Sequence, residues 1–321
     1  MSDKLTLKNQ NEIRFADSPV LIAAWPGLGN VGMVAVDYVR KQLEAQHYGS
    51  VDLRPFVIPP AGVVKNGKFL PHEPLVSTLH YKKSPDLLIY ESNMQVEGRE
   101  GMFLMQQLFD VARKHQVRQI LTFAAIPQPV SHTRDSRLYY AANSSDVSEK
   151  LQHLGVKPLP AGEIPGPAGV LPGMAYSNGI EAACIMATMP AYAGAASYPK
   201  ASLPVLNLLE ELLDCSIDLE GLKKGVKRME EQFEIIESRV REHFPQMLAD
   251  EKQEDEVDVE ELIGNVPSQP EDDIPREARM NIEKLFREAA QDRSRAVELK
   301  EELDRWGLFR RFENRFLDLF S

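Results

Sequence analysis

The residues best suited to chemistry in this chain lie in a glycine-rich turn near its beginning. The turn, residues 26–30, joins an apolar run that ends at Trp25 to a helical pattern of apolar residues that begins at Val31. The N-terminus of a helix exposes unpaired N–H groups and the positive end of the helix dipole. The turn therefore predicts a site for an anion or another polar ligand, formed by Gly27, Gly29 and Asn30.

Further polar side chains lie near runs that are predicted to be strands. In an open α/β sheet, ligands bind beyond the carboxyl ends of the strands, where we expect these side chains to gather. Arg134 and the first helix N-terminus would hold a phosphate, with Asn178 as a further ligand residue. Glu91 or Glu181 would act as the general base, and His132 as the proton carrier. The alternative is a structural role, such as an ion pair for Arg134 and a solvated strand end for Glu91.

Three of the early glycines also fit the G-x-G-x-x-G pattern of dinucleotide-binding folds. Asp52 follows Gly32 at about the distance where such folds place the acid that binds the ribose. The context does not fit, because Asp52 opens the strand predicted over 51–58 and Pro55 would interrupt that strand. The simpler explanation is that the glycines let a helix pack closely on a sheet. No cofactor is expected, and the histidines are too scattered to predict a metal site.

Composition limits the kind of partner. The net charge is −11 over 321 residues, and residues 251–321 alone hold 20 acids and 12 bases, so a basic face for nucleic acid is not expected. Cys184 and Cys215 lie in apolar runs, which favours a reducing compartment over a disulfide framework. No apolar segment approaches the length of a membrane span. We expect a cytoplasmic protein that binds neither nucleic acid nor membrane.

The elements that must position these residues alternate between strand and helix, which predicts an α/β fold with a largely parallel sheet. A hairpin around Asn66-Gly67 makes the sheet mixed. Strands are predicted over 20–25, 51–58, 85–91, 119–125 and 138–142, and helices over 31–43, 101–115, 146–154 and 204–213, with a further apolar element over 179–189. The prolines of 126–129 are predicted to end a strand, and the proline- and glycine-rich residues 158–173 to form a surface loop.

The C-terminal third differs from the rest. Asp218 is predicted to cap a long helix whose apolar seam, from Leu219 to Val240, could pair with a neighbouring helix. We therefore predict a body over 1–245, an acidic flexible linker over 246–274, and a helix with an apolar tail over 275–321. The tail needs a surface to cover, either on a partner or on its own body. Its candidate partner-binding residues are Leu299, Leu303, Trp306, Phe309, Phe312 and Phe316.

Four motifs occur in an order that indicates a family. They are Trp-Pro-Gly-Leu-Gly-Asn-Val-Gly over 25–32, Val-Ser-His-Thr-Arg over 130–134, Gly-Pro-Ala-Gly-Val-Leu-Pro-Gly over 166–173, and Met-Pro-Ala-Tyr over 189–192. Over residues 20–244 the chain resembles the proteasome assembly chaperone family, named after the second such chaperone, in its archaeal and bacterial branch. The resemblance implies a three-layer αβα sandwich of the phosphorylase/hydrolase-like kind, to which this chain adds a helical C-terminal extension. It also implies homo-oligomers and no established enzymatic activity for most prokaryotic members.

From these observations we expect a non-enzymatic protein that binds itself and a proteasome-like or other multisubunit protein complex. Some archaeal relatives look like chaperones that dock through a C-terminal hydrophobic-Tyr-any motif. This chain departs from that motif, because it ends Asp318-Leu319-Phe320-Ser321. The alternative is a small-molecule-binding enzyme of the hydrolase or phosphorylase type that uses the cleft after the first strand.

Overall fold

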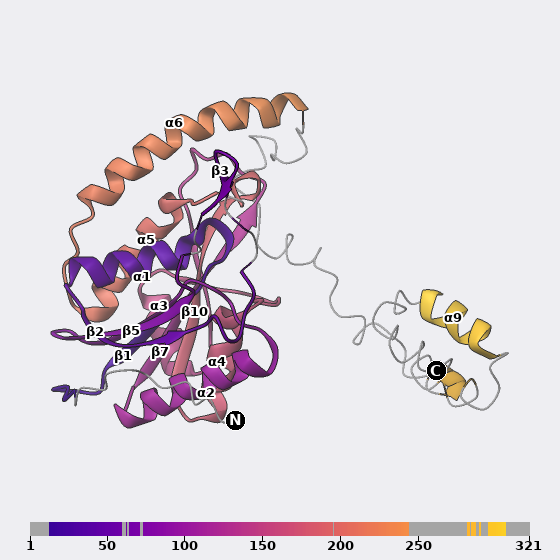
Figure 1. Ribbon diagram of the computed structural model, residues 1–321, viewed down its shortest axis with the longest axis horizontal. Helices are drawn as coiled ribbons and strands as arrows, with labels where there is room; N and C mark the ends of the chain where they lie inside the picture. Colours follow the sequence, from indigo (N-terminus) through magenta and orange to yellow (C-terminus); the bar gives the residue numbers. More distant parts are fainter. Residues whose placement is uncertain are drawn as a thin grey trace. The chain divides into compact units, whose positions relative to one another are not determined.

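The first part of the chain forms a sheet covered by helices on both faces (Figure 1). The computed structural model describes residues 13–59, 62, 64–70, 73–194 and 196–243, and in the C-terminal region 281–282, 284–286, 289 and 295–305. The chain divides into two compact units, Met1–Glu256 and Val257–Ser321, which are described separately. The predicted α/β sandwich is confirmed in the first unit.

The main sheet has eight strands in the order β2-β5-β6-β1-β7-β10-β8-β9. Its four central strands are parallel: β6 (Asp86–Ser92), β1 (Val20–Ala24), β7 (Gln119–Gln128) and β10 (Glu181–Pro190). On one side β5 (Val76–Lys83) and β2 (Gln46–Asp52) are antiparallel to their neighbours. On the other side β8 (Leu138–Ala142) is antiparallel to β10, and β9 (Lys157–Pro158) is parallel to β8. The predicted mixed, mostly parallel sheet is confirmed.

Two helical layers bury the two faces of the sheet. One layer contains α1 (Val31–Gln42), α3 (Ser145–His153), α5 (Pro199–Leu213) and α6 (Glu220–His243). The other contains α2 (Gly98–Lys114) and α4 (Pro167–Ser177). Neighbouring residues of a strand point to opposite faces, so Ile22 joins the first apolar cluster and Leu21 the second. This explains why β1 is an unbroken apolar run, as strands of buried parallel sheets are.

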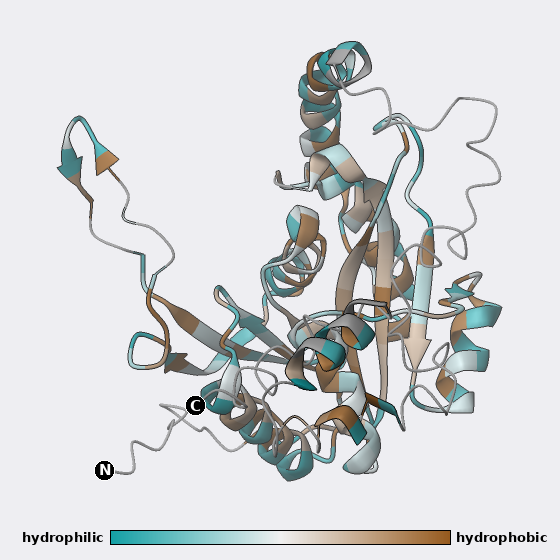
Figure 2. Cartoon of the chain, turned by 90° about the vertical axis from the view of Figure 1, so that its right-hand side faces the viewer, coloured by the Kyte–Doolittle hydropathy of each residue, from teal (hydrophilic) through white to brown (hydrophobic). Residues whose placement is uncertain are grey.

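A separate two-stranded sheet stands apart from the body (Figure 2). It consists of β3 (Val64–Lys65) and β4 (Lys68–Phe69), which pair around Asn66 and Gly67. Both turn residues have positive φ, 52° and 73°, as a two-residue hairpin requires. The predicted hairpin is confirmed.

Two strands differ from the sequence-based prediction. The strand expected over 51–58 is misplaced, because β2 ends at Asp52 and residues 53–56 form a turn closed by a hydrogen bond from Phe56 N to Leu53 O. Its partner β5 was not predicted. β7 continues through Pro127 to Gln128, although the prolines were expected to end it. Beyond Thr122 β7 no longer pairs with β1, so at Pro127 only the ladder with β10 remains.

One helix was not predicted, and another begins earlier than predicted. The expected loop over 158–173 ends in α4, which begins at Pro167, and α5 begins at Pro199 rather than Pro204. Proline suits the first turn of a helix, where no N–H is needed. Pro172 and Pro204 lie inside these helices, and the buried faces of α4 and α5 offset the cost of the proline.

The seam of α6 packs on its own body up to Phe233, since the side chains of Leu222, Val226, Met229 and Phe233 are buried. Ile236 is 41% exposed, and Glu237 takes the next buried position. In the second unit, α9 (Ala296–Arg305) buries Leu299 and Leu303. The predicted linker over 246–274 and the tail residues Trp306, Phe309, Phe312 and Phe316 lie outside the described residues.

Two further features bear on the expected setting. Among the described helices, none is long and apolar enough to span a membrane. Neither cysteine is in a disulfide: Cys184 is buried in β10, and Cys215 is half-buried after α5. Burial raises the pKa of the Cys184 thiol to about 12.

Candidate functional site

The carboxyl ends of β1, β7 and β10 meet at one edge of the sheet, which we call the carboxyl edge. Here the glycine turn leaves β1 with Gly29 and Asn30 in the left-handed region, at φ of 60° and 49°. A Cβ on Gly29 would lie 2.7 Å from Sδ of Met189, and one on Gly32 would lie 2.9 Å from Cβ of Phe123. The two glycines are therefore required for close packing on β7 and β10, as the simpler explanation of the pattern held.

The structure does not bring the residues of the dinucleotide pattern together. Asp52 ends β2, and β5 and β6 separate that strand from β1. Its carboxylate instead bonds Arg54 two residues along the chain. The acid that would bind a ribose is thus far from the turn that would bind a pyrophosphate.

Other loops close over the glycine turn. Nε2 of Gln95 donates a hydrogen bond of 2.5 Å to the carbonyl of Pro26, and the backbone N–H of Tyr198 donates one of 2.8 Å to the carbonyl of Gly29. Thr122 Oγ1 donates to the carbonyl of Ala168, at the start of α4. The four sequence motifs, separated by up to about 160 residues, thereby meet at the carboxyl edge.

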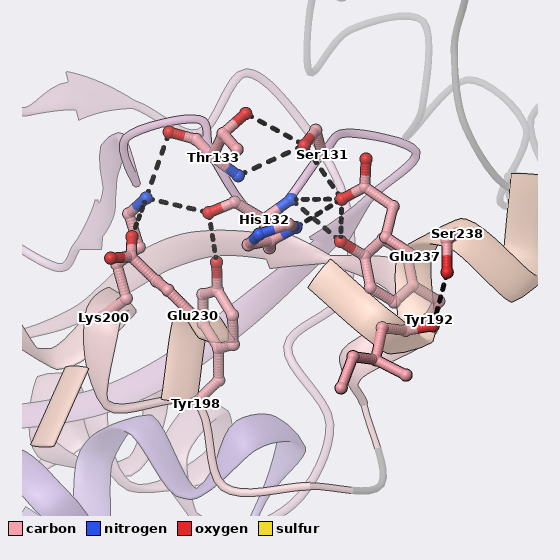
Figure 3. Close-up of polar contacts among 10 residues, drawn as sticks. Ser131, His132, Thr133, Tyr192, Tyr198, Lys200, Glu230, Glu237 and Ser238 are labelled. Atoms are coloured by element: carbon pink, nitrogen blue, oxygen red, sulfur yellow. Dashed lines mark hydrogen bonds and ion pairs between the residues drawn. The ribbon is translucent and has the colours of Figure 1, made fainter. Parts of the chain in front are cut away.

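The loop after β7 is held there by one carboxylate of α6 (Figure 3). Oε2 of Glu237 accepts hydrogen bonds from Oγ of Ser131 at 2.9 Å, from the backbone N–H of His132 at 3.0 Å and from the Tyr192 hydroxyl at 2.6 Å. The His132 ring contacts the same oxygen through Nδ1 at 2.5 Å. Because a carboxylate only accepts, Nδ1 carries the proton. His132 and Glu237 are 6% and 5% exposed, so this network is buried.

A buried lysine holds the other side of the same loop. Nζ of Lys200 donates to the carbonyls of His132 and Thr133 at 2.8 and 3.1 Å, and pairs with Glu230 of α6 at 2.8 Å. The hydroxyl of Tyr198 also donates to the His132 carbonyl. The backbone of the loop is thus fixed from α5 and α6, as Figure 3 shows.

This environment keeps the two tyrosines neutral. Burial, followed by the neighbouring Glu237 carboxylate, raises the pKa of Tyr192 far above its usual value. Burial and then Glu230 do the same for Tyr198. Both hydroxyls therefore serve as hydrogen-bond donors and not as bases.

Glu91 lies at the end of β6, under α1, away from His132. Its Oε2 is 2.5 Å from Nε of Arg40 and 3.9 Å from Nδ1 of His80. Burial raises the pKa of Glu91, while Arg40 opposes that rise. Burial and Arg40 lower the pKa of His80 to about 4. Glu91 is thus a buried ion-pair partner, and the solvated strand end considered for it is not found.

The structure separates the remaining candidates from the carboxyl edge. Glu181 is the first residue of β10 and Asn178 ends α4, so both lie at the opposite edge of the sheet. There Glu181 accepts from Ser144 and Asn178 from Arg113. The expectation that they join His132 and Arg134 is wrong, because the apolar segment preceding them was not recognised as a helix. Gly27, Asn30, His132 and Arg134 are near the carboxyl edge, and Glu91 is at the same edge, at the end of β6 and below α1.

The residues that organise the edge were missed by the sequence analysis. Glu237 was hidden in the α6 seam, where Ile236 was taken as the inward residue. The signal available was its spacing of four from Phe233, which places it on the buried face. Within the described parts of the chain, no group of three or more His, Cys, Asp or Glu side chains is placed to hold a metal ion.

Comparison with known proteins identifies the family at this point. Residues 21–237, from β1 to the carboxylate that holds the His132 loop, match the PAC2 family. The chain belongs to the PAC2 family. An uncharacterised protein of Methanocaldococcus jannaschii, MJ1210, is 23% identical over 236 residues, which are 73% of this chain and 88% of that protein.

Solved structures share the PAC2 fold. PbaB of Pyrococcus furiosus, described as an archaeal proteasome activator, has a TM-score of 0.61 at 22% identity, over 72% of this chain and 98% of that one. PbaA of the same organism, described as an archaeal homolog of proteasome-assembly chaperone, has a TM-score of 0.56 at 22% identity, over 73% and 94%. Rv2125 of Mycobacterium tuberculosis, a proteasome-assembly chaperone homologue, has 0.56 at 21%, over 66% and 93%. At these identities the likeness concerns the fold.

Proposed function

We propose that this PAC2-family chain acts without catalysis, as a cytoplasmic homo-oligomer that binds and helps to assemble a larger protein complex. The observation that carries the proposal is the internal use of the polar groups at the carboxyl edge. Nδ1 of His132, the Ser131 hydroxyl and the Tyr192 hydroxyl all contact Glu237. A residue that turns over a ligand needs a polar atom within reach of that ligand.

The same observation weighs against the alternative, an enzyme of the hydrolase or phosphorylase type. That reading needs His132 as a proton carrier near a general base. His132 is buried, Glu91 is held in an ion pair with Arg40 of α1, and Glu181 lies at the opposite edge of the sheet. A polar ligand at Gly27, Gly29 and Asn30, beside Arg134, remains a prediction from the sequence.

For the partner we propose a proteasome-like or other multisubunit protein complex. The support comes from relatives whose descriptions name proteasome activation or assembly, with which this chain shares a family and a fold. We further propose that the tail contacts this partner through Trp306, Phe309, Phe312 and Phe316. Leu299 and Leu303 are buried in their own unit, so we propose that they support this contact indirectly and do not touch the partner.

The test uses full-length chain with a purified proteasome-type core particle and, separately, with its unassembled subunits. Binding is measured by co-sedimentation in the analytical ultracentrifuge. A variant with alanine at Trp306, Phe309, Phe312 and Phe316 should bind about tenfold more weakly or worse. The matched control is Phe69→Ala, which removes an aromatic side chain that is 80% exposed on the hairpin.

The outcomes separate the parts of the proposal. Absence of binding by the full-length chain to either form overturns the proposed partner. Equal binding by the fourfold variant and the Phe69→Ala control leaves the partner in place and overturns the role of the tail. A metabolite that co-purifies with the chain and is lost in Arg134→Ala would favour the enzyme instead.

A further inference from the structure

The hydrogen-bond donors around Glu237 converge on one oxygen atom (Figure 3). The Ser131 hydroxyl, the N–H and Nδ1 of His132 and the Tyr192 hydroxyl all lie within 3.0 Å of Oε2. A carboxylate oxygen offers about two lone pairs, so four donors are more than this oxygen satisfies fully. We call Ser131, His132 and Tyr192 the donor cluster. The cluster offers more donors than its present acceptor atom uses.

The donor cluster is held in place by contacts outside α6. Nζ of Lys200, in α5, donates to the carbonyl of His132 at 2.8 Å. Oγ of Ser131 accepts a hydrogen bond of 3.2 Å from the backbone N–H two residues further along the loop. Tyr192 lies in the turn directly after the central strand β10. Donors fixed in this way stay in position when their acceptor leaves, which lowers the entropic cost of binding another one.

The end of α6 that carries Glu237 is buried through that residue alone. The helix is anchored as far as Phe233, whose ring lies 6.1 Å from that of Tyr192 and 5.5 Å from that of Tyr198. From residue 235 to residue 239, Glu237 is the only buried residue, and Ile235 is 60% exposed. We call residues 235–243 the strap. Helix ends open locally more readily than packed helix centres.

We propose that the donor cluster is a carboxylate-binding site, that Glu237 fills it as an internal ligand, and that opening of the strap admits the carboxylate of another molecule. The ligand class follows from the occupant, because the group that the donors hold is itself a carboxylate. Exchange of one carboxylate for another leaves the buried charge unchanged. A ligand that is not tethered to a helix also brings both oxygens to the donors. This role does not depend on the partner proposed above.

Competition between Glu237 and the ligand gives the site a signature. The apparent affinity for a ligand is reduced by the fraction of chains in which the strap is open. Removal of the Glu237 carboxylate should therefore strengthen the binding of other carboxylates. If Glu237 were instead part of the structure that shapes the site, its removal would weaken binding or leave it unchanged.

The first experiment measures acetate binding to the full-length chain from the shift in its unfolding temperature, with sodium chloride at equal ionic strength as the reference. Acetate should raise the unfolding temperature of Glu237→Ala and bind it at least about tenfold more tightly than wild type. Glu234→Ala is the matched control, because Glu234 is exposed on the same helix, and should respond as wild type does. Adding Tyr192→Phe to Glu237→Ala removes one donor and should weaken acetate binding about tenfold.

Three results would overturn the carboxylate site. They are a Glu237→Ala chain that responds to acetate no more than to chloride, an acetate effect equal in wild type and variant, and an effect that survives in the double variant. If Glu237→Ala is unfolded without ligand, acetate should restore a cooperative unfolding transition, and failure to do so overturns the site as well.

The second experiment tests the strap in wild type by amide hydrogen exchange with mass spectrometry. Amides of residues 235–243 should exchange faster than those of residues 222–233, through an opening that leaves the rest of α6 closed. Strap amides that exchange only at the rate of global unfolding would overturn the opening and make Glu237 a fixed structural residue.

A final arm distinguishes the two sources of a carboxylate, a small acid and an acidic segment of a protein. It compares acetate with a hexaglutamate peptide on Glu237→Ala. Peptide binding more than about tenfold tighter than acetate binding assigns the site to an acidic protein segment, because the excess exceeds the statistical gain from six carboxylates. A smaller ratio assigns it to a small carboxylic acid.

Discussion

A single carboxylate oxygen, Oε2 of Glu237, joins two loops and a helix through contacts with three residues. Such a group is stable when buried only because each lone pair has a donor. If the carboxylate is removed, Nδ1 of His132 and the Tyr192 hydroxyl lose their acceptor, while the Ser131 hydroxyl and the His132 N–H keep contacts with Thr133 and Tyr192. The penalty for this is larger than the net value of the bonds themselves. Glu237 thus couples the C-terminal half of α6 to the loop after β7.

Glu237→Ala should therefore lower the free energy of unfolding by about 2–4 kcal/mol. Urea denaturation followed by circular dichroism measures the change. Glu234→Ala is the matched control, because Glu234 is exposed on the same helix and its loss should change stability by less than about 0.5 kcal/mol. Equal losses in the two variants would show that helix propensity, and not the buried network, causes the effect.

His80 should make stability depend on pH. Its pKa is about 4 in the folded chain, against 6.5 when exposed, because of burial and Arg40. The unfolded chain therefore takes up a proton as the pH falls below 6.5, while the folded chain does not, and stability falls between pH 6.5 and 4. Asp37 acts in the opposite direction on His80, and the raised pKa of Glu91 offsets part of the loss, so we expect about 1–2 kcal/mol.

The comparison of wild type with His80→Gln in urea at pH 7 and pH 4.5 isolates this effect. The variant should lose less stability than wild type over the same interval. A variant that loses as much as wild type would assign the pH dependence to other groups, such as His115, whose pKa is also lowered by burial. The residue scale is where sequence reasoning was weakest, because Glu91 and Arg40 are 51 positions apart and no local pattern indicates that they pair.

At the scale of elements, the two central glycines of α4 should respond oppositely to alanine. Gly173→Ala should raise the free energy of unfolding of the single chain by about 0.5–1 kcal/mol, because the new methyl meets open space. Gly169→Ala should lower it by about 1–3 kcal/mol, because its Cβ would lie too close to the Ile164 carbonyl. Urea denaturation at low protein concentration measures both.

A stabilising effect of both substitutions would show that α4 begins later than Gly169. Element boundaries near proline were also the least predictable from sequence. Pro127 was expected to end a strand and Pro172 to lie in a loop, yet both lie inside regular elements. Proline removes only a donor and fixes one dihedral. Whether the missing N–H matters depends on whether a neighbouring segment needs it as a hydrogen-bond donor. This follows only from the arrangement of the elements in the folded chain.

At the scale of the whole molecule, α6 should decide whether the first unit folds. Four of its apolar side chains are buried on the body, and each is worth about 1.5–3 kcal/mol. Their sum is comparable to the total stability of a domain. A chain ending at residue 219 should fail to fold, whereas one ending at residue 245 should unfold cooperatively within about 1 kcal/mol of full length.

Circular dichroism and thermal unfolding of the two truncated chains check this. If the chain 1–219 folds, α6 is not required for folding of the sheet. If the chain 1–245 is much less stable than full length, the second unit contributes to the stability of the first. The sequence predicted the α/β class, the parallel centre and the hairpin, because the apolar periodicities of strands and helices are local. It did not predict that α6 closes over the carboxyl edge, because that contact joins Glu237 to residues about 100 positions away.

The two cysteines allow local unfolding of the sheet to be measured from their labelling rates. Cys215 is half-buried and offers a thiol that labelling reagents reach from the folded state. Cys184 sits in the central strand β10 with a pKa of about 12, so it becomes a reactive thiolate only when β10 leaves the sheet. The ratio of the two labelling rates therefore counts how often the sheet separates under native conditions. The measurement needs a thiol reagent but no denaturant and no engineered residue.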